Sequence, residues 1–232
     1  MSDTKPPRAH DVIAVDGPSG SGKSTLSKAV ARERGWRYLD TGAMYRAVAL
    51  AVLERGVDPA DSDKVAALAR ELRLDPATDP DAPGLRLDGV DVTEAVRGPE
   101  VTAAVSLVAA VPAVRELLVA RQREIAASGG IVVEGRDIGS VVLPQAGLKV
   151  WLTADHEERA RRRSAEYAAS GVSTSVEQEK GALARRDQLD SARTTSPALP
   201  APDAFEVDST SSSVPELVAL VLAELDRRTA SS

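Results

Sequence analysis

VIAVDGPSGSGKSTLSKAV, residues 12–30, is the stretch that decides the fold. The apolar run Val12 to Val15 predicts a strand, and Leu26, Ala29 and Val30 have the i, i+3, i+4 spacing of a helix. Between them lies GPSGSGKST, residues 17–25, of which 17–24 match G-x-x-x-x-G-K-[ST]. The glycines of this pattern let successive backbone N–H groups curl around an anion. The sequence therefore predicts a strand, a phosphate-binding loop and a helix, with a nucleoside triphosphate as the ligand.

Each part of this loop has a predicted task. Loop amides and the helix start hold the β- and γ-phosphates, Lys23 adds a mobile positive charge, and the Ser24 hydroxyl coordinates Mg²⁺ directly. A glycine- and serine-rich turn that matches by chance is the alternative, but the flanking strand and helix both argue against it. The residues expected to contact the phosphates are Gly17, Ser19, Gly20, Ser21, Gly22, Lys23, Ser24 and Thr25.

Composition limits the remaining interpretations. With 232 residues, 43% hydrophobic and 28% charged, the chain suits one α/β core with a modest insertion. A net charge of −6 argues against binding nucleic acid through a general basic surface, and the lack of cysteine excludes disulfides and thiolate metal sites. Residues 1–10 are expected to form a disordered tail without a secretory signal, and no apolar run approaches the ~20 residues of a membrane span. We therefore expect a cytoplasmic protein.

A second informative stretch is DTGAMYR, residues 40–46. It follows a predicted strand at 36–39 and begins a predicted helix that Thr41 can cap. Asp40 lies where that strand ends, and ligands bind at the carboxyl edge of an open parallel sheet. Two interpretations stay open from these residues alone. Asp40 and Thr41 only cap the helix and Arg46 is one more exposed arginine, or this stretch faces a ligand.

The segment LRLDGVDV, residues 85–92, alternates apolar and polar residues on both sides of Asp88-Gly89. This pattern predicts an antiparallel hairpin with a two-residue turn. Residues 58–74 before it predict a loop and a helix, and residues 75–84 a break. Because a hairpin interrupts the strand-and-helix alternation, we expect an inserted substructure that grips a second substrate. The residues expected to share one face of the hairpin are Leu85, Leu87, Val90 and Val92.

Ile131 to Val133 is a β-branched run, typical of a parallel strand that is buried on both faces. It ends in EGRDIG, residues 134–139, which brings a carboxylate, a cation and another carboxylate onto a glycine-bracketed turn. Such residues at the carboxyl end of a central strand can bind a polar ligand and the water shell of a Mg²⁺ ion. Just upstream, a helix at 101–111 is expected to stop at Pro112, and a second helix follows it.

The helix expected after Asp155 is rich in arginine. Arg159, Arg162 and Arg163 share one face at i, i+3, i+4 and can converge on a single polyanion, while Arg161 points away. A solvated charged face is the alternative for these residues.

Three further elements complete the predicted fold. Residues 176–191 predict a helix and 205–207 the last strand. A closing amphipathic helix at 215–228 is expected to face the core with Leu217, Leu220, Val221 and Leu225. About five parallel strands with helices between them indicate an α/β fold with a P-loop kinase core.

Several motifs together identify a family. They are GPSGSGKST, DTGAMYRA, the pattern PxVRxxLxxxQR from Pro112 to Arg123, EGRDIG, and RDQLDSARTTSP followed by DAFEVDST. In this order and spacing they resemble bacterial cytidylate kinases, which are P-loop nucleoside monophosphate kinases, and the resemblance covers about Val12 to Arg228. It implies transfer of a phosphoryl group from ATP to CMP or dCMP with Mg²⁺, by a monomer without nucleic-acid or membrane partners.

The resemblance also implies a division of the chain. One kinase domain at 11–228 would contain an inserted antiparallel substructure at about 58–110, which binds the monophosphate, and an arginine-rich lid at about 156–175. Residues 1–10 and 229–232 would be tails.

By resemblance, each site residue has a role. Three arginines would hold the CMP phosphate: Arg46, Arg136 and Arg193. Arg186 and Asp190 would hold the sugar, Ser106, Arg115 and Asp137 would read the cytosine, and Thr41 and Tyr45 would lie near the acceptor. The lid residues on the ATP phosphates would be Arg159, Arg162 and Arg163. Lys23, Arg136, Arg162 and Arg193 would be catalytic, and Glu134 would act on Mg²⁺ through water.

Rival functions differ in testable ways. A GTPase needs an N-K-x-D motif to read guanine, and this chain contains no asparagine. Kinases of UMP, AMP or shikimate share the phosphate loop and remain the nearer alternatives. A non-catalytic nucleotide-binding module is also possible from the loop alone.

Overall fold

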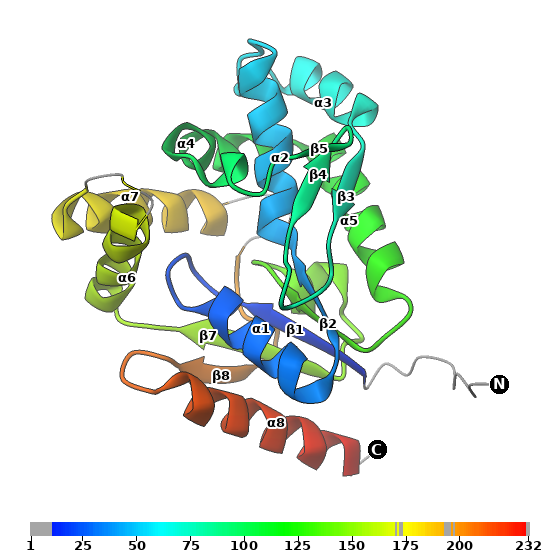
Figure 1. The fold of residues 1–232 in the computed structure, drawn as a ribbon, viewed down its shortest axis with the longest axis vertical. Coiled ribbons are helices and arrows are strands. Elements are labelled where there is room, and N and C mark those ends of the chain that lie inside the picture. The colour runs from blue at the N-terminus through cyan, green and yellow to red at the C-terminus, as the bar shows by residue number, and fades with distance from the viewer. Residues whose placement is uncertain (1–10, 170, 172–173, 193–195, 197, 231–232) are drawn as a thin grey trace.

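The computed structural model describes residues 11–169, 171, 174–192, 196 and 198–230. Its main sheet has five parallel strands in the order β2-β6-β1-β7-β8 (Figure 1). The strands are β1 (Val12–Asp16), β2 (Arg37–Asp40), β6 (Ile131–Glu134), β7 (Leu148–Thr153) and β8 (Phe205–Asp208). The predicted α/β class and parallel sheet are confirmed, although β2 begins one residue later than expected.

The sheet order decides where the functional residues meet. β6 lies between β2 and β1, with Asp40 opposite Glu134 and Val15 also opposite Glu134. Because the three strands are parallel, their carboxyl ends form one edge. The phosphate loop after β1, the DTGAMYR stretch after β2 and the EGRDIG turn after β6 all begin at that edge.

Helices cover both faces of this sheet. On one face, α1 (Lys23–Arg34) and α8 (Val214–Ala230) share an apolar cluster with β1, β6 and β7. α1 ends as predicted at Gly35, which takes the left-handed conformation with φ 64° that glycine favours. Residues of α2 (Thr41–Glu54) and α5 (Pro112–Ala126) belong to the cluster on the other face.

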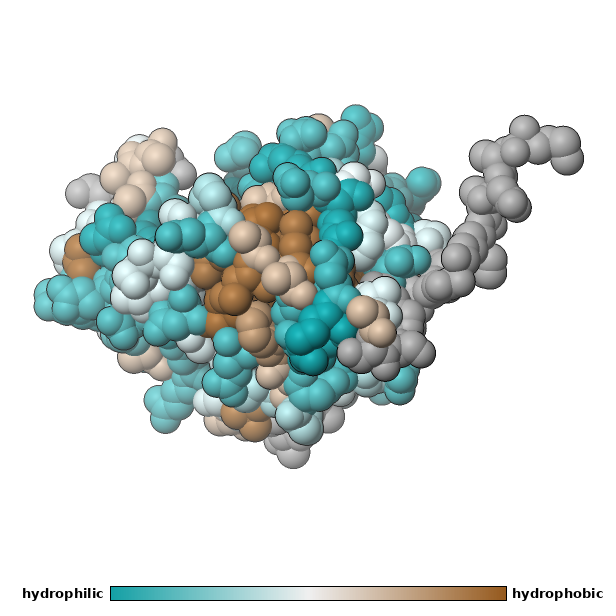
Figure 2. Space-filling view, turned by 90° about the horizontal axis from the view of Figure 1, so that it is seen from below, coloured by the Kyte–Doolittle hydropathy of each residue, from teal (hydrophilic) through white to brown (hydrophobic). Residues whose placement is uncertain are grey.

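The face that α8 buries is narrower than predicted. Leu217, Val221 and Leu225 are buried, but Leu220 is 46% exposed, so its assignment to the core was wrong. At 3.6 residues per turn, Leu220 lies about 100° from the centre of the stripe formed by the other three. Figure 2, viewed from the α8 side, shows apolar residues gathered within a hydrophilic rim.

The expected hairpin is present as part of a second sheet, β3-β4-β5. Its strands are β3 (Leu74–Pro76), β4 (Leu85–Leu87) and β5 (Val90–Asp91). Asp88 and Gly89 both have positive φ, 51° and 86°, as a tight two-residue hairpin turn requires. Val90 pairs with Leu87, so these two residues share one face of the hairpin as predicted. Val90 is nevertheless 65% exposed, because it lies on the edge strand.

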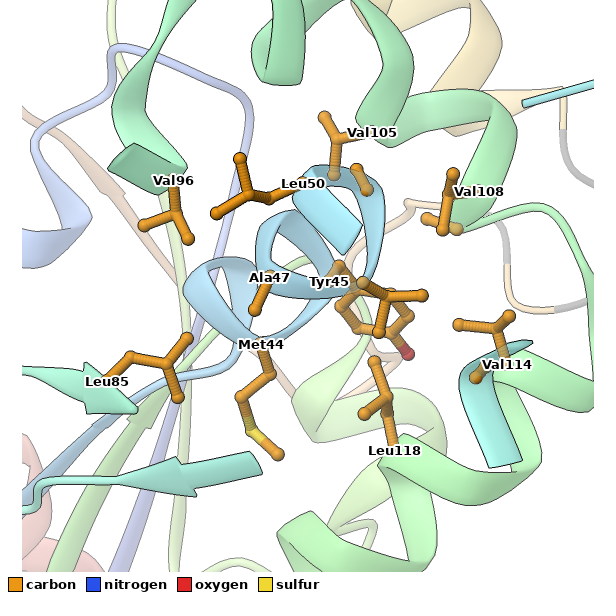
Figure 3. Packing of buried hydrophobic residues seen from close by; sticks show 14 of the residues in the cluster. Met44, Tyr45, Ala47, Leu50, Leu85, Val96, Val105, Val108, Val114 and Leu118 are labelled. Atoms are coloured by element: carbon orange, nitrogen blue, oxygen red, sulfur yellow. The ribbon is translucent and has the colours of Figure 1, made fainter. Parts of the chain in front are cut away.

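This inserted sheet packs onto α2 together with α3 (Ser62–Glu71), the 3₁₀-helix η2 (Ala95–Arg97) and α4 (Pro99–Val108). Figure 3 shows Met44, Tyr45, Ala47 and Leu50 of α2 surrounded by apolar side chains. Those side chains are Leu85, Val96, Val105, Val108, Val114 and Leu118. The insertion therefore shares its core with the helix that carries Tyr45 and Arg46.

α4 and α5 meet at a sharp joint. Pro112 is the first residue of α5, where its missing N–H costs nothing, and the two helices are bent by 100°. Among the described residues no single helix has the length and hydropathy to cross a membrane, and only this bent pair passes that test jointly.

Two further helices follow β7. α6 (His156–Ala169) and α7 (Val176–Ser191) pack against each other, and α7 begins with a capping box formed by Ser175 and Gln178. The EGRDIG turn continues into a short π-helix, η3 (Ile138–Val142).

Candidate active site

A cavity of about 310 Å³ lies over the carboxyl ends of β1, β2 and β6. Side chains from the core, the insertion and both α6 and α7 line it. Predicted site residues on its wall are Ser19, Gly20, Gly22, Lys23, Ser24, Thr25, Thr41, Tyr45, Arg46, Ser106, Arg115, Glu134, Arg136, Asp137, Arg163, Arg186 and Asp190. The structure thus brings together residues that are up to 171 positions apart in the chain.

The phosphate loop has the backbone that its glycines predict. Gly17 has φ 148°, and a Cβ there would lie 2.1 Å from the Leu152 carbonyl oxygen, so no other residue fits. Lys23 is buried, and its Nζ donates to the Pro18 carbonyl at 2.6 Å. Burial lowers the pKa of the Lys23 ammonium, and the nearby Arg136 charge adds to this. An anion in the loop would offset both effects.

Ser24 and Glu134 form a pair that suits a magnesium ion. Ser24 Oγ donates to Glu134 Oε1 at 2.7 Å, while the buried Glu134 Oε2 has no hydrogen-bond partner among the described residues. Burial raises the pKa of the Glu134 carboxyl. The described residues contain no group of three or more His, Cys, Asp or Glu side chains that could hold a metal. Mg²⁺ typically uses one or two protein oxygens and completes its shell with water and phosphate, so the pair fits it.

Thr41 has a different local role from the predicted one. Asp40 is the N-cap of α2, because its carboxylate accepts from the Ala43 N–H at 2.9 Å. Thr41 is the first helical residue, and its Oγ1 donates to the Glu134 carbonyl oxygen at 2.7 Å. The expectation that Thr41 caps this helix was therefore wrong, although Thr41 does line the cavity.

A buried ion pair forms part of the cavity wall. Arg115 and Asp137 bond through Nη2 and Oδ2, and each side chain is only 6% exposed. The Arg115 guanidinium also lies 5.6 Å from the centre of the Tyr45 ring. A fixed carboxylate beside a fixed guanidinium offers an acceptor and donors to one flat polar ligand.

Guanidinium groups surround Asp190 on the cavity wall. Arg136 Nε lies 3.3 Å and Arg186 Nε 3.9 Å from Asp190 Oδ2, and Ser106 Oγ donates to Oδ1 at 3.4 Å. Burial lowers the pKa of Arg186 to about 9, and the charges of Arg136 and Arg46 add to the shift. Arg46 Nε is buried without a hydrogen-bond partner among the described residues. Converging guanidinium groups of this kind can bind an anion.

Comparison with known proteins fixes the family. The family model described as cytidylate kinase matches residues 13–227. The chain belongs to the cytidylate kinase family. It is 50% identical over 207 residues to a cytidylate kinase of Limosilactobacillus reuteri (strain DSM 20016), covering 89% of this chain and 91% of that one. It is 53% identical over 199 residues to a cytidylate kinase of Mycobacterium avium (strain 104), covering 85% and 87%. The predicted family, and with it a kinase, is confirmed.

The three predicted lid arginines of α6, Arg159, Arg162 and Arg163, contact different parts of this kinase. Arg159 is buried and donates from Nε to the Ser19 carbonyl at 2.8 Å. Arg162 donates to the Ser209 carbonyl at 2.7 Å, while Arg163 lines the cavity and lies 4.7 Å from the Tyr167 ring centre. Arg159 and Arg162 therefore contact loops around the phosphate site, and only Arg163 reaches the cavity wall. Arg193, the remaining predicted ligand, lies outside the described residues.

Several residues on or beside the site were missed by the sequence reasoning. Asp16 is buried and accepts from the Ile138 and Gly139 N–H groups, both at 2.8 Å, so it fixes the turn that carries Asp137. Burial raises the pKa of Asp16 to about 6. Arg97 and Lys28 also line the cavity. A signal existed only for Asp16, a carboxylate at the end of an otherwise apolar strand.

Proposed function

We propose that this cytidylate kinase family member transfers the γ-phosphoryl group of ATP to CMP or dCMP, giving ADP and CDP or dCDP. The observation that carries the proposal is the buried Arg115–Asp137 pair, which shares one cavity with the phosphate loop. Family membership supports the same reaction.

The pair matches the polar edge of cytosine. Cytosine presents an amino donor beside two acceptors, so Asp137 would accept from the amino group while Arg115 and Ser106 would donate to the acceptors. Uracil has a carbonyl acceptor in place of the amino donor and an N–H donor in place of the neighbouring N3 acceptor. A buried site whose polar groups are left unpaired rejects the wrong ligand by about 1–3 kcal/mol for each lost bond, so UMP should be a poor acceptor.

Arginines would hold the CMP phosphate from several directions. Arg46, Arg136 and Arg193 are assigned to the phosphate, and Arg186 with Asp190 to the sugar, with Thr41 and Tyr45 beside the acceptor. Arg46 Nε is buried and has no hydrogen-bond acceptor among the described residues, which supports this assignment.

Phosphoryl transfer needs little proton chemistry here, because the attacking group is already an ionised phosphate oxygen. Catalysis is then alignment and charge neutralisation. Lys23, Arg136, Arg162 and Arg193 would supply the positive charge from the protein. The Ser24 hydroxyl would hold Mg²⁺ directly and Glu134 would hold it through water, and the bound ion would neutralise phosphate charge.

Two parts of the single domain 11–228 would move. The insertion, about 58–110, would close over CMP, and the lid, about 156–175, would bring its arginines onto the ATP phosphates. Closure excludes water that would otherwise hydrolyse ATP. We also propose that the protein is a cytoplasmic monomer, as its resemblance to the cytidylate kinase family implies.

A coupled assay of ADP release tests the function. We expect CMP and dCMP to be the leading acceptors among CMP, dCMP, UMP, AMP and shikimate, and Lys23→Ala to abolish the activity. Omitting Mg²⁺ should also abolish ADP release. A preference for any acceptor other than CMP and dCMP would overturn the proposal.

A further inference from the structure

Tyr38 occupies an unusual place for a core aromatic residue. It lies in β2, is 2% exposed, and its ring belongs to the apolar cluster beneath α1 with Leu26 and Val30. Its hydroxyl leaves this cluster at the carboxyl edge of the sheet and donates to Glu134 Oε1 at 2.6 Å. The predicted site did not include this residue.

Glu134 therefore receives two hydroxyl donors on one oxygen. Tyr38 and Ser24 both donate to Oε1, at 2.6 and 2.7 Å, from β2 and from the first turn of α1. Oε2 is buried, has no partner among the described residues, and belongs to a side chain on the cavity wall. Two donors on one oxygen fix the rotation of the carboxylate and leave the other oxygen available as an acceptor.

Two interpretations of the Tyr38 hydroxyl are a role beside a magnesium ion and a core hydroxyl that only needs a hydrogen-bond partner. The arrangement at Glu134 favours the first. A serine hydroxyl can offer a lone pair to Mg²⁺ while its O–H group still donates a hydrogen bond to Glu134 Oε1. A magnesium-bound water needs an acceptor such as Glu134 Oε2. Partners that orient metal ligands are a general part of metal sites. The Ser24 hydroxyl would then bind both the metal and Glu134. The hydrogen bond from Tyr38 would be the one that serves only to hold the Glu134 carboxylate in place.

We propose that Tyr38 is a positioning residue for the magnesium nucleotide: its hydroxyl holds Glu134 so that Oε2 accepts a hydrogen bond from metal-bound water. This inference rests on the proposed use of Mg²⁺ with ATP. It does not depend on which monophosphate accepts the phosphoryl group, so the test contains no acceptor.

The test is Tyr38→Phe in the full chain, which keeps the buried ring and removes one oxygen. Calorimetric titration of Mg²⁺ into protein saturated with ADP measures the metal affinity, and titration of ADP without Mg²⁺ measures nucleotide affinity. We expect the Mg²⁺ dissociation constant to rise about tenfold, the lower end of the effects known for residues that orient metal ligands. The affinity for metal-free ADP should stay within about twofold, since no loop amide is disturbed.

A matched control and a second variant separate positioning from packing. Tyr167→Phe also removes a phenol oxygen, but from α6, where the hydroxyl accepts from Arg163, and it should leave the Mg²⁺ affinity unchanged. Glu134→Gln removes the charge that Tyr38 orients. If Tyr38 acts through Glu134, adding Tyr38→Phe to Glu134→Gln should weaken Mg²⁺ binding by less than about twofold more.

Two results would overturn the inference. One is a Mg²⁺ affinity within about twofold of the natural protein alongside a lowered melting temperature, which would leave Tyr38 a structural role only. The other is an equal loss of affinity for ADP with and without Mg²⁺. Failure of the natural protein to bind ADP with Mg²⁺ at all would instead count against the proposed function.

Discussion

Asp137→Asn is the substitution that most directly tests base recognition. It keeps the size of the side chain but replaces one carboxylate oxygen by an NH₂ group. Asp137 and Arg115 are each 6% exposed, so solvent does not screen their interaction. A hydrogen bond to a charged group contributes about 1.5–3 kcal/mol, which corresponds to a loss of about 10- to 150-fold in kcat/KM for CMP.

UMP should respond differently. The asparagine NH₂ can donate to uracil, so we expect kcat/KM for UMP to fall by less than about threefold or to rise. The preference for CMP over UMP should then fall by at least about tenfold. The assay is coupled ADP release at saturating ATP with CMP or UMP varied, at a temperature where the variant is folded, because breaking a buried pair costs up to about 3–5 kcal/mol of stability.

Asp203→Asn is the matched control. Asp203 also forms an ion pair, with Lys149, but it is 58% exposed and lies off the cavity wall. This variant should leave both kcat/KM values unchanged. Equal losses on CMP and UMP in Asp137→Asn would refute a role for Asp137 in reading the base.

Two further substitutions test residues that the sequence reasoning missed. Arg97→Ala should raise KM for CMP about threefold and leave KM for ATP unchanged, which is the size of effect expected of an exposed charge on the cavity wall. As a control, Arg86→Ala on the same insertion should change neither KM value. Equal effects of the two substitutions would remove Arg97 from the site. Protonated Asp16 contributes stability below about pH 4 that is lost as the pH rises through its raised pKa of about 6, a span of about 3 kcal/mol. Urea unfolding between pH 4 and 7 should therefore show this loss in the natural protein and not in Asp16→Asn, and parallel stability curves would contradict the effect.

Local signals explain what the sequence could predict. The phosphate loop, the strand before it and the helix after it are encoded within residues 12–30, and the structure has all three. The turn at Asp88-Gly89 was predictable because positive φ at two adjacent residues favours that dipeptide. β3 was not, because Leu74–Pro76 is a short segment that ends in proline and becomes a strand only by pairing with β4.

Long-range partners explain what the sequence could not predict. Asp40 and Thr41 are both good caps at adjacent positions, and the choice between them depends on the Glu134 carbonyl, 93 residues away, which binds the Thr41 hydroxyl. Similarly, Arg159 and Arg162 lie on one face of α6, but Arg159 is paired with Asp187 and Arg162 contacts Ser209. The spacing of these arginines predicted that they share one face of a helix, but it could not predict which residues each of them contacts.

The cavity wall carries an excess of positive charge. The chain carries a net charge of −6, yet Arg46, Arg136, Arg163 and Arg186 line one cavity, so the field there is opposite in sign to the whole molecule. Burial lowers the pKa of Arg186 to about 9, repulsion from the other three arginines adds to the shift, and Asp190 offsets only part of it. The free protein thus keeps a destabilising positive cluster, which a phosphate bound as proposed would relieve. Because nucleotide phosphates stay anionic throughout the transfer, such a cluster would stabilise bound substrates and the transition state without any group having to change its charge.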